Sequence, residues 1–299
     1  TGSRPTSSRR PPTNAATAAC AARSAPPHEE VRDYFYQRRN YIHELDIAAE
    51  EMTNRMRMHS ADIRREIMNR IENVHGISIV RRVDLGDYTL HRLNSEERRL
   101  EFSAALSAGQ RTFKLASELC YLEYHDLLDE LVDQGNFTSE DARSLALLGL
   151  ANYFAAAVVL PPYSQFHGAA EDFRYDIERL SAFYAVSYET ICHRLSTLQR
   201  PNLRGIPWSF VRVDRAGNMS KRQSATGFHF SSSGGTCPLW NVYETFASPG
   251  KILTQIARCP TAATTSGWRA PSSAGPHGTD NPVRPSPSAW DANSAMPAG

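Results

Sequence analysis

The sequence predicts an α+β protein, in which a helical part with a small sheet precedes a shorter β-rich part. Apolar residues recur at helical spacing over most of residues 28–200, interrupted by three strand-like runs between 77 and 104. From residue 204 onward, apolar and polar residues alternate and are separated by turn signals. We therefore predict a first domain at 28–200 and a β-rich region at 201–258, which we expect to be incomplete.

The two ends of the chain differ in composition from the middle. Residues 1–27 and 259–299 are crowded with small residues and proline. Such segments bury too little apolar surface to fold, so we predict that both are disordered. When plausible codons for the C-terminal range are regrouped by one base, they read as a turn followed by a strand. We therefore interpret 259–299 as a frameshifted tail, and 1–27 as a disordered or non-native leader.

Composition excludes several classes of protein. The 299 residues carry a net charge of +1, so no overall basic field favours nucleic acid. We find no continuous run of about 18 apolar residues, which a membrane span requires. The five cysteines are odd in number and form no Cys-x-x-Cys pair. This usage fits a reducing compartment, so we expect a cytoplasmic protein.

The elements follow in order along the chain. A long helix is predicted from residue 28, with Glu29 and Glu30 favoured by the helix dipole and Gly76 at its end. Strands are predicted at 77–83, 88–93 and 98–104. Two helices follow, and Pro161 and Pro162 stop the second. A helical pair at 170–198 precedes strands at 206–215 and 224–230, which flank a turn at 216–218.

Residues 111–125 (RTFKLASELCYLEYH) and 150–162 (LANYFAAAVVLPP) resemble the two metal-binding helices of the ImmA/IrrE-type metallopeptidases. In that family His-Glu-x-x-His on the first helix and a Glu on the second hold zinc. Ser117 and Tyr121 stand at the histidine positions here, Glu118 at the general-base position, and Leu150 at the third ligand position. None of the three replacements is a usual zinc ligand. We therefore expect no zinc, no catalytic residues and no enzyme activity.

Residues 192–246 resemble the short-chain fatty acyl transcriptional regulators of the mycobacterial PrpR/RamB-like type. The resemblance implies sensing of acyl-coenzyme A, particularly propionyl-CoA, in the control of propionate and glyoxylate metabolism. It also implies an N-terminal helix-turn-helix domain, which we do not find before His28, and a [4Fe–4S] cluster held by cysteines. Family-like sequence is expected to stop after Arg258. Because Cys237 is then the single family-pattern cysteine, we expect this chain to hold no cluster.

The resemblance does not assign the ligand contacts, so we predict them from residue chemistry. Without its metal, the peptidase cleft offers an apolar slot for the acyl group around Tyr121, Leu150 and Tyr153; the alternative is that the cleft is filled as core. Cations on one hairpin could bind the phosphates, the alternative being a solvated basic surface. These cations are Arg212, Arg215, Lys221 and Arg222, with Arg204 joining them.

Two other functions remain open at this stage. The chain could be a residual zinc metallopeptidase. It could also bind DNA through residues 176–199, which resemble a helix-turn-helix, with His193 and Arg194 as readers and Arg200 beyond them. We favour a structural role for that segment. The expected partner is acyl-CoA, with DNA contacted only through a missing N-terminal domain; no membrane partner is expected, and homodimer formation is left open.

Overall fold

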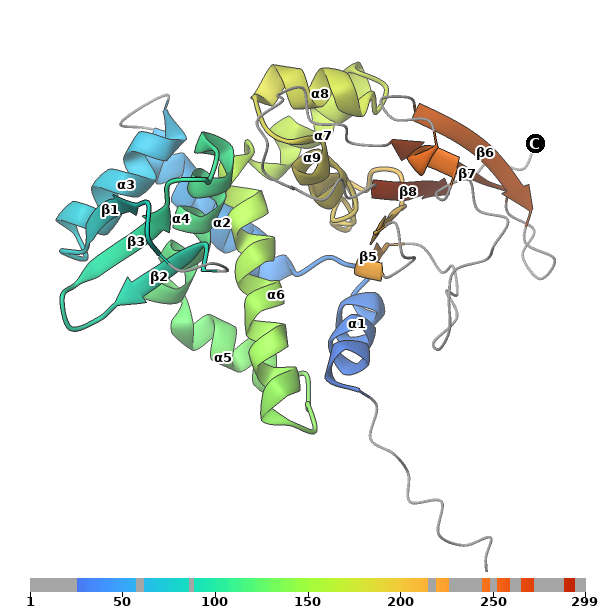
Figure 1. Cartoon of the computed structure of the whole chain (residues 1–299). Coiled ribbons are helices and arrows are strands. Elements are labelled where there is room, and N and C mark those ends of the chain that lie inside the picture. The colour runs from blue at the N-terminus through green and yellow to red at the C-terminus, as the bar shows by residue number, and fades with distance from the viewer. Residues whose placement is uncertain are drawn as a thin grey trace, which may run out of the picture.

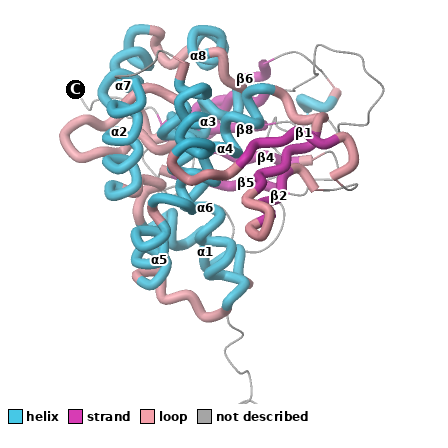
Figure 2. The backbone as a smooth tube through the Cα atoms, turned by 90° about the vertical axis from the view of Figure 1, so that its left-hand side faces the viewer, coloured by secondary structure: helices cyan, strands magenta, loops and turns pink. Residues whose placement is uncertain are grey.

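The computed structural model describes residues 26–57, 62–85, 89–214, 219–225, 244–247, 252–258, 265–271 and 288–293. Figure 1 shows the helical body with a small sheet on its left, a larger sheet on its right and three short helices above. The view turned by 90° places the small sheet in front of the larger one (Figure 2). The α+β class predicted from the sequence is confirmed.

The N-terminal region consists of separate helices, so the prediction of one long helix is wrong. These are α1 (Pro27–Gln37), α2 (His43–Arg57) and α3 (Ile63–Asn73). The chain turns after α1 because Arg39 and Asn40 adopt left-handed backbone angles, with φ of 51° and 56°. The side chain of Asn40 is buried and donates a hydrogen bond to Ser196 Oγ at 2.7 Å, which offsets part of the cost of that conformation.

The small sheet contains β1 (Ser78–Arg82), β2 (His91–Asn94) and β3 (Arg99–Ser103), in the order β1-β3-β2. β3 pairs in parallel with β1 and antiparallel with β2. Leu100 and Phe102 alternate along β3 and are both buried in the main hydrophobic core. The three strands predicted between 77 and 104 are therefore confirmed.

Three helices form the centre of the molecule: α4 (Ala108–Glu123), α5 (His125–Asp133) and α6 (Glu140–Val159). α6 ends just before the proline pair, as predicted. By length and a mean hydropathy of 1.5, α6 could cross a membrane. However, 56% of that window is buried, and α1, α2, α4 and α5 all pack against it. Its apolar composition is that of a core helix.

A second hydrophobic cluster lies under α7 (Tyr163–Asp172), α8 (Ile177–Tyr184) and α9 (Tyr188–Leu195). Ala185 adopts a left-handed conformation that ends α8, and the Ser187 side chain caps α9. Trp208 and Phe210, from the strand that follows, are buried in the same cluster. This cluster joins the helical part to the larger sheet.

The larger sheet is antiparallel, with strand order β5-β4-β8-β7-β6. A short 3₁₀ helix, η1 (Glu244–Phe246), precedes β6. The strands are β4 (Trp208–Val213), β5 (Met219–Ser224), β6 (Ile252–Arg258), β7 (Thr265–Pro271) and β8 (Ser288–Asn293).

Two sequence predictions need correction in this sheet. The strand that pairs with β4 is residues 219–224, so it begins before the predicted 224–230, of which residues 226–230 lie outside the described part of the chain. The predicted turn at 216–218 lies outside the described residues. β7 and β8 fall within 259–299, so the prediction of disorder is wrong for these segments. Their backbones pair with β6 and β4, which gives their N–H and C=O groups hydrogen-bond partners that the composition of the range does not reveal. The frameshift remains a prediction.

Candidate functional site

The three positions that replace zinc ligands are packed rather than open. Ser117 Oγ donates a hydrogen bond to the Phe113 carbonyl oxygen at 3.1 Å, within its own helix. Leu150 is completely buried and has no donor atom. Tyr121 packs against the same core, and burial raises the pKa of its phenol to about 12. A neutral phenol, a hydroxyl bonded to the backbone and a leucine do not fit a zinc ion.

Glu118, at the position of the peptidase general base, has a different partner. His91 Nε2, on β2, lies 2.9 Å from Glu118 Oε1. Both side chains are partly buried, so this pair fastens α4 to the small sheet. Within the described part of the chain, no group of three or more His, Cys, Asp or Glu side chains could hold a metal ion.

The acyl slot predicted around Tyr121, Leu150 and Tyr153 is wrong. Leu150 and Tyr153 belong to the main core, with exposed fractions of 0% and 2%. Burial raises the pKa of Tyr153 well above its ordinary value. The space left by the metal is therefore filled by side chains. Of the three residues, Tyr153 alone borders a cavity described below, which lies on the side of α1.

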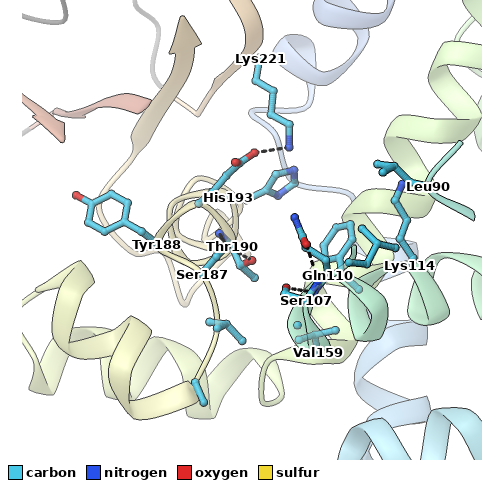
Figure 3. Close-up of a pocket in the computed structure, with 16 residues that line it drawn as sticks. Leu90, Ser107, Gln110, Lys114, Val159, Ser187, Tyr188, Thr190, His193 and Lys221 are labelled. Carbon is cyan, nitrogen blue, oxygen red and sulfur yellow. Dashed lines mark hydrogen bonds and ion pairs between the residues drawn. The ribbon is translucent and has the colours of Figure 1, made fainter. Parts of the chain in front are cut away.

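Two cavities lie instead between the helical part and the β4–β5 hairpin. The larger, of about 590 Å³, is enclosed by the N-terminal half of α4, the α8–α9 turn, α9 and β5 (Figure 3). The smaller, of about 210 Å³, lies between α1, α6 and β5. His193 and Lys221 line both cavities, so the two spaces share a wall.

The larger cavity combines an apolar wall with features that favour anions. Its apolar side chains are Leu90, Leu106, Phe113, Val159 and Val186. Two helices begin at the cavity, where Ser107 caps α4 and Ser187 caps α9 (Figure 3). Helix N-termini carry partial positive charge and free N–H groups. Lys114 and Lys221 add full positive charges in the same space.

Glu189 organises the cations of the hairpin. Lys221 Nζ lies 2.7 Å from Glu189 Oε1, and Arg212 Nη1 lies 3.2 Å from Glu189 Oε2. Burial opposes ionisation of this carboxyl, but the two cations lower its pKa below the ordinary value. The structure therefore brings together Arg212 and Lys221, as the sequence predicts, but around an acidic residue that the sequence argument did not include.

The other predicted cations lie elsewhere. Arg222 lines the smaller cavity, where burial lowers the pKa of its guanidinium and Arg32 adds to the effect. Arg204 is exposed and lines neither cavity, so it does not join the cluster. Arg215 and Cys237 lie outside the described residues.

Two residues of the cavity wall were missed as ligand contacts. Lys114 is half-buried, and burial lowers the pKa of its amine, an effect that Lys221 strengthens and Glu118 opposes. His193 is 7% exposed, and burial lowers its pKa to about 3. Its Nε2 lies 2.8 Å from Gln223 Nε2, whereas Nδ1 has no hydrogen-bond partner. The rarity of lysine in the sequence could have drawn attention to Lys114.

The helix-turn-helix-like segment is not available to DNA. α9 is buried from Ile191 to Leu195, including both proposed readers, His193 and Arg194. Arg194 Nη1 lies 2.8 Å from Asp46 Oδ1 on α2, with both side chains almost fully buried. Arg200 Nη2 lies 2.9 Å from Glu50 Oε2, also on α2. These contacts show a structural role for α9 and contradict the DNA-binding alternative for this segment.

The described cysteines do not come together. Cys120 is buried in the main core and Cys192 in the second cluster, and burial raises the pKa of each thiol above its ordinary value. Buried neutral thiols in separate cores do not fit an iron–sulfur cluster, whose ligands are thiolates. Cys20, Cys237 and Cys259 lie outside the described residues.

Two family models match adjacent parts of the chain. Residues 72–196 match the IrrE N-terminal-like domain. Residues 197–266 match the C-terminal domain of short-chain fatty acyl coenzyme A regulators. This second match continues past Arg258, where we expected family-like sequence to stop.

The relatives are transcriptional regulators. The chain is 69% identical over 234 residues to the HTH-type transcriptional regulator RamB of Mycobacterium tuberculosis, and 48% identical to PrpR of the same species. It is 41% identical to the propionyl-CoA carboxylase regulator of Cereibacter sphaeroides. These alignments cover 78% of this chain and 49%, 48% and 49% of the relatives. The chain thus spans about half the length of the curated relatives it matches.

A solved structure gives the same result. A Mycobacterium tuberculosis transcriptional regulator superimposes with a TM-score of 0.82 and 43% identity, covering 90% of this chain and 81% of that one. The likeness extends over the helical part and the larger sheet together. On the matched domains, the identities and this superposition, the chain belongs to the family of short-chain fatty acyl coenzyme A regulators.

Proposed function

We propose that this chain is the ligand-sensing part of a transcriptional regulator and that its effector is a short-chain acyl-CoA, with propionyl-CoA the first candidate. The proposal gives the chain no catalytic function and assigns DNA binding to another domain of such a regulator. One observation carries it: the 590 Å³ cavity is lined mainly by IrrE-like residues and is bordered by Lys221 from the acyl-CoA regulator residues. A ligand there contacts both domains at once.

The cavity chemistry suits the two ends of such a ligand. An acyl-CoA has phosphates at one end and a short apolar chain at the other. The phosphates would find Lys221 and the N-terminus of α9, where charge-assisted hydrogen bonds are strongest. The acyl chain would contact the apolar side chains of α4 and α6, namely Phe113 and Val159.

The ion pair between Lys221 and Glu189 must be weakened when this ligand binds, and its weakening changes the contact between β5 and α9. A phosphate that binds Lys221 competes with the Glu189 carboxylate 2.7 Å away. Binding therefore loosens the contact between β5 and α9 and replaces it with contacts to the ligand. A change of this kind at the boundary between two domains is the local event that a sensor requires.

Calorimetry tests the proposal directly. Titration of the chain with propionyl-CoA should release heat with one-site stoichiometry, and Lys221→Gln should weaken binding about tenfold or more, since a hydrogen bond to a charged group contributes about 1.5–3 kcal/mol. Arg64→Gln is the matched control, because this arginine lies at the start of α3, away from both cavities. A folded chain that shows no binding to propionyl-CoA would refute the proposal.

A further inference from the structure

Lysine is scarce in this chain and concentrated at one place. The sequence contains 33 basic Lys and Arg residues, of which three are lysines: Lys114, Lys221 and Lys251. Two of the three line the larger cavity, from α4 on one side and β5 on the other (Figure 3). Lys251 lies outside the described residues. The chemistry that separates lysine from arginine is nucleophilicity: a lysine amine loses its proton when it is buried, whereas a guanidinium stays charged.

The two cavity lysines are held in different states. Lys221 lies 2.7 Å from the Glu189 carboxylate and is held in an ion pair with it. Lys114 forms no ion pair with any carboxylate of the described residues, and the nearby Glu118 is already paired with His91. Half of the Lys114 side chain is buried beside an apolar wall, and a second cation shares its cavity. Desolvation and a neighbouring cation are the two means by which proteins activate a lysine as a nucleophile.

We propose that Lys114 is a self-acylation site, which takes the acyl group from a short-chain acyl thioester bound in the larger cavity. This inference rests on the proposed function, because the thioester is the effector proposed above. The Lys114 amine loses its proton to solvent, and its Nζ then attacks the thioester carbonyl carbon. A C–N bond forms, the C–S bond breaks, and coenzyme A leaves as a thiol with the proton that the nitrogen gives up. No oxidant, reductant or further reactant is needed.

The remaining cavity residues suit this transfer. The carbonyl oxygen becomes negative as the nitrogen attacks, and Lys221 supplies positive charge in the same space. The product is a neutral amide on Lys114. Acylation therefore removes one positive charge from the cavity wall and fills part of the cavity with the acyl chain. Because the amide is covalent, this change persists after coenzyme A has left.

The test uses the whole chain and propionyl-CoA near neutral pH, read by intact mass and then by peptide mapping. We expect one propionyl group per chain, located on Lys114, with an equal amount of coenzyme A released. Lys114 should react about tenfold or more faster than Lys221 or Lys251, because the bound thioester is held beside its amine. Lys114→Arg keeps the charge and should abolish the modification, whereas Lys251→Arg should leave it unchanged.

Two further arms separate chemistry in the cavity from random acylation. A coenzyme A thioether, which binds but cannot transfer its acyl group, should suppress the reaction, and the urea-unfolded chain should lose the preference for Lys114. Propionyl-CoA that binds without modifying Lys114, or equal acylation of all three lysines, overturns self-acylation and leaves the proposed function intact. Absence of both binding and acylation removes the proposed function as well.

Discussion

The two ends of α4 differ in packing: the C-terminal end is buried in the core, and the N-terminal end lines a cavity. At its C-terminal end, Ser117 and Tyr121 stand where a peptidase holds zinc; Ser117 is buried, and Tyr121 packs against the core that contains Leu150. At its N-terminal end, Gln110 and Lys114 line a 590 Å³ cavity. The comparison shows that loss of the metal did not leave a pocket where the metal had been. The open space lies two turns earlier, where a second domain covers the helix.

The largest effect we expect is at the packed end. Leu150→Ala deletes a completely buried side chain and should lower the free energy of unfolding by about 2–5 kcal/mol. Leu148→Ala, on the same helix and 45% exposed, is the matched control and should change it by less than about 0.5 kcal/mol. Urea denaturation of both variants measures this. Equal losses would show that the former zinc position is not the better packed of the two.

The second prediction concerns the wall between the cavities. The folded chain holds the pKa of His193 near 3 because of burial, against 6.5 when exposed, so between these values the unfolded chain binds a proton that the folded chain does not. His193 therefore stabilises the fold above pH 6.5, and this stability is lost as the pH falls toward 3, by up to about 1.4 kcal/mol per pH unit.

Denaturation of His193→Gln between pH 6.5 and 4.5 isolates this contribution, since the carboxyls with lowered pKa titrate below that window. The variant should show a flatter pH dependence than the parent chain. If the free energy of unfolding depends on pH equally in the variant and the parent chain, water reaches His193 from the cavities and the wall between them is solvated.

At the open end, the same helix should tolerate added bulk. A Cβ built on Gly109, near the start of α4, meets no atom within 4 Å. Gly109→Leu should therefore keep the stability of the parent within about 0.5 kcal/mol while its side chain occupies the cavity and weakens propionyl-CoA binding about tenfold. Binding and melting measured on one preparation test this. Full affinity in a stable variant would place the ligand outside the cavity.

The smallest effect is expected at Arg204. The sequence argument grouped it with the phosphate-binding cations, but it is exposed and lines neither cavity. Arg204→Gln should leave propionyl-CoA affinity within a factor of about two, which corresponds to less than about 0.5 kcal/mol. A loss as large as that of Lys221→Gln would move the phosphate site away from α9 and support the sequence argument instead.

Sequence reasoning succeeded where the signal is local. Alternating apolar residues located the three strands of the small sheet, and Pro161 marked the end of α6. It failed at Arg39 and Asn40, because a left-handed turn held by a hydrogen bond to Ser196 depends on a residue 156 positions away. The strand β8 was missed for the same reason, since it pairs with β4, which is distant in the chain; β7 pairs with the neighbouring β6 and was missed because its range is crowded with small residues.

The sequence predicted some residues of the site but not the position of the open space, because that position depends on packing between distant elements. Motif spacing identified Ser117, Tyr121 and Leu150 as replaced ligands, but spacing does not say whether a vacated cleft stays open, which depends on packing from other helices. Lys221 and Arg212 were expected at one site because they lie on one hairpin. Glu189, which holds them, and His193, which separates the cavities, come from another element and only the fold brings them there.

The buried pair between Asp46 and Arg194 has a mechanical consequence. It joins α2 to α9, the helix that lines the larger cavity, and Arg200 extends the connection to Glu50. Separating two charges in a dry interior leaves each without solvation, so these helices resist being pulled apart. We therefore expect α2, in the N-terminal part of the chain, to move together with α9 when α9 is displaced.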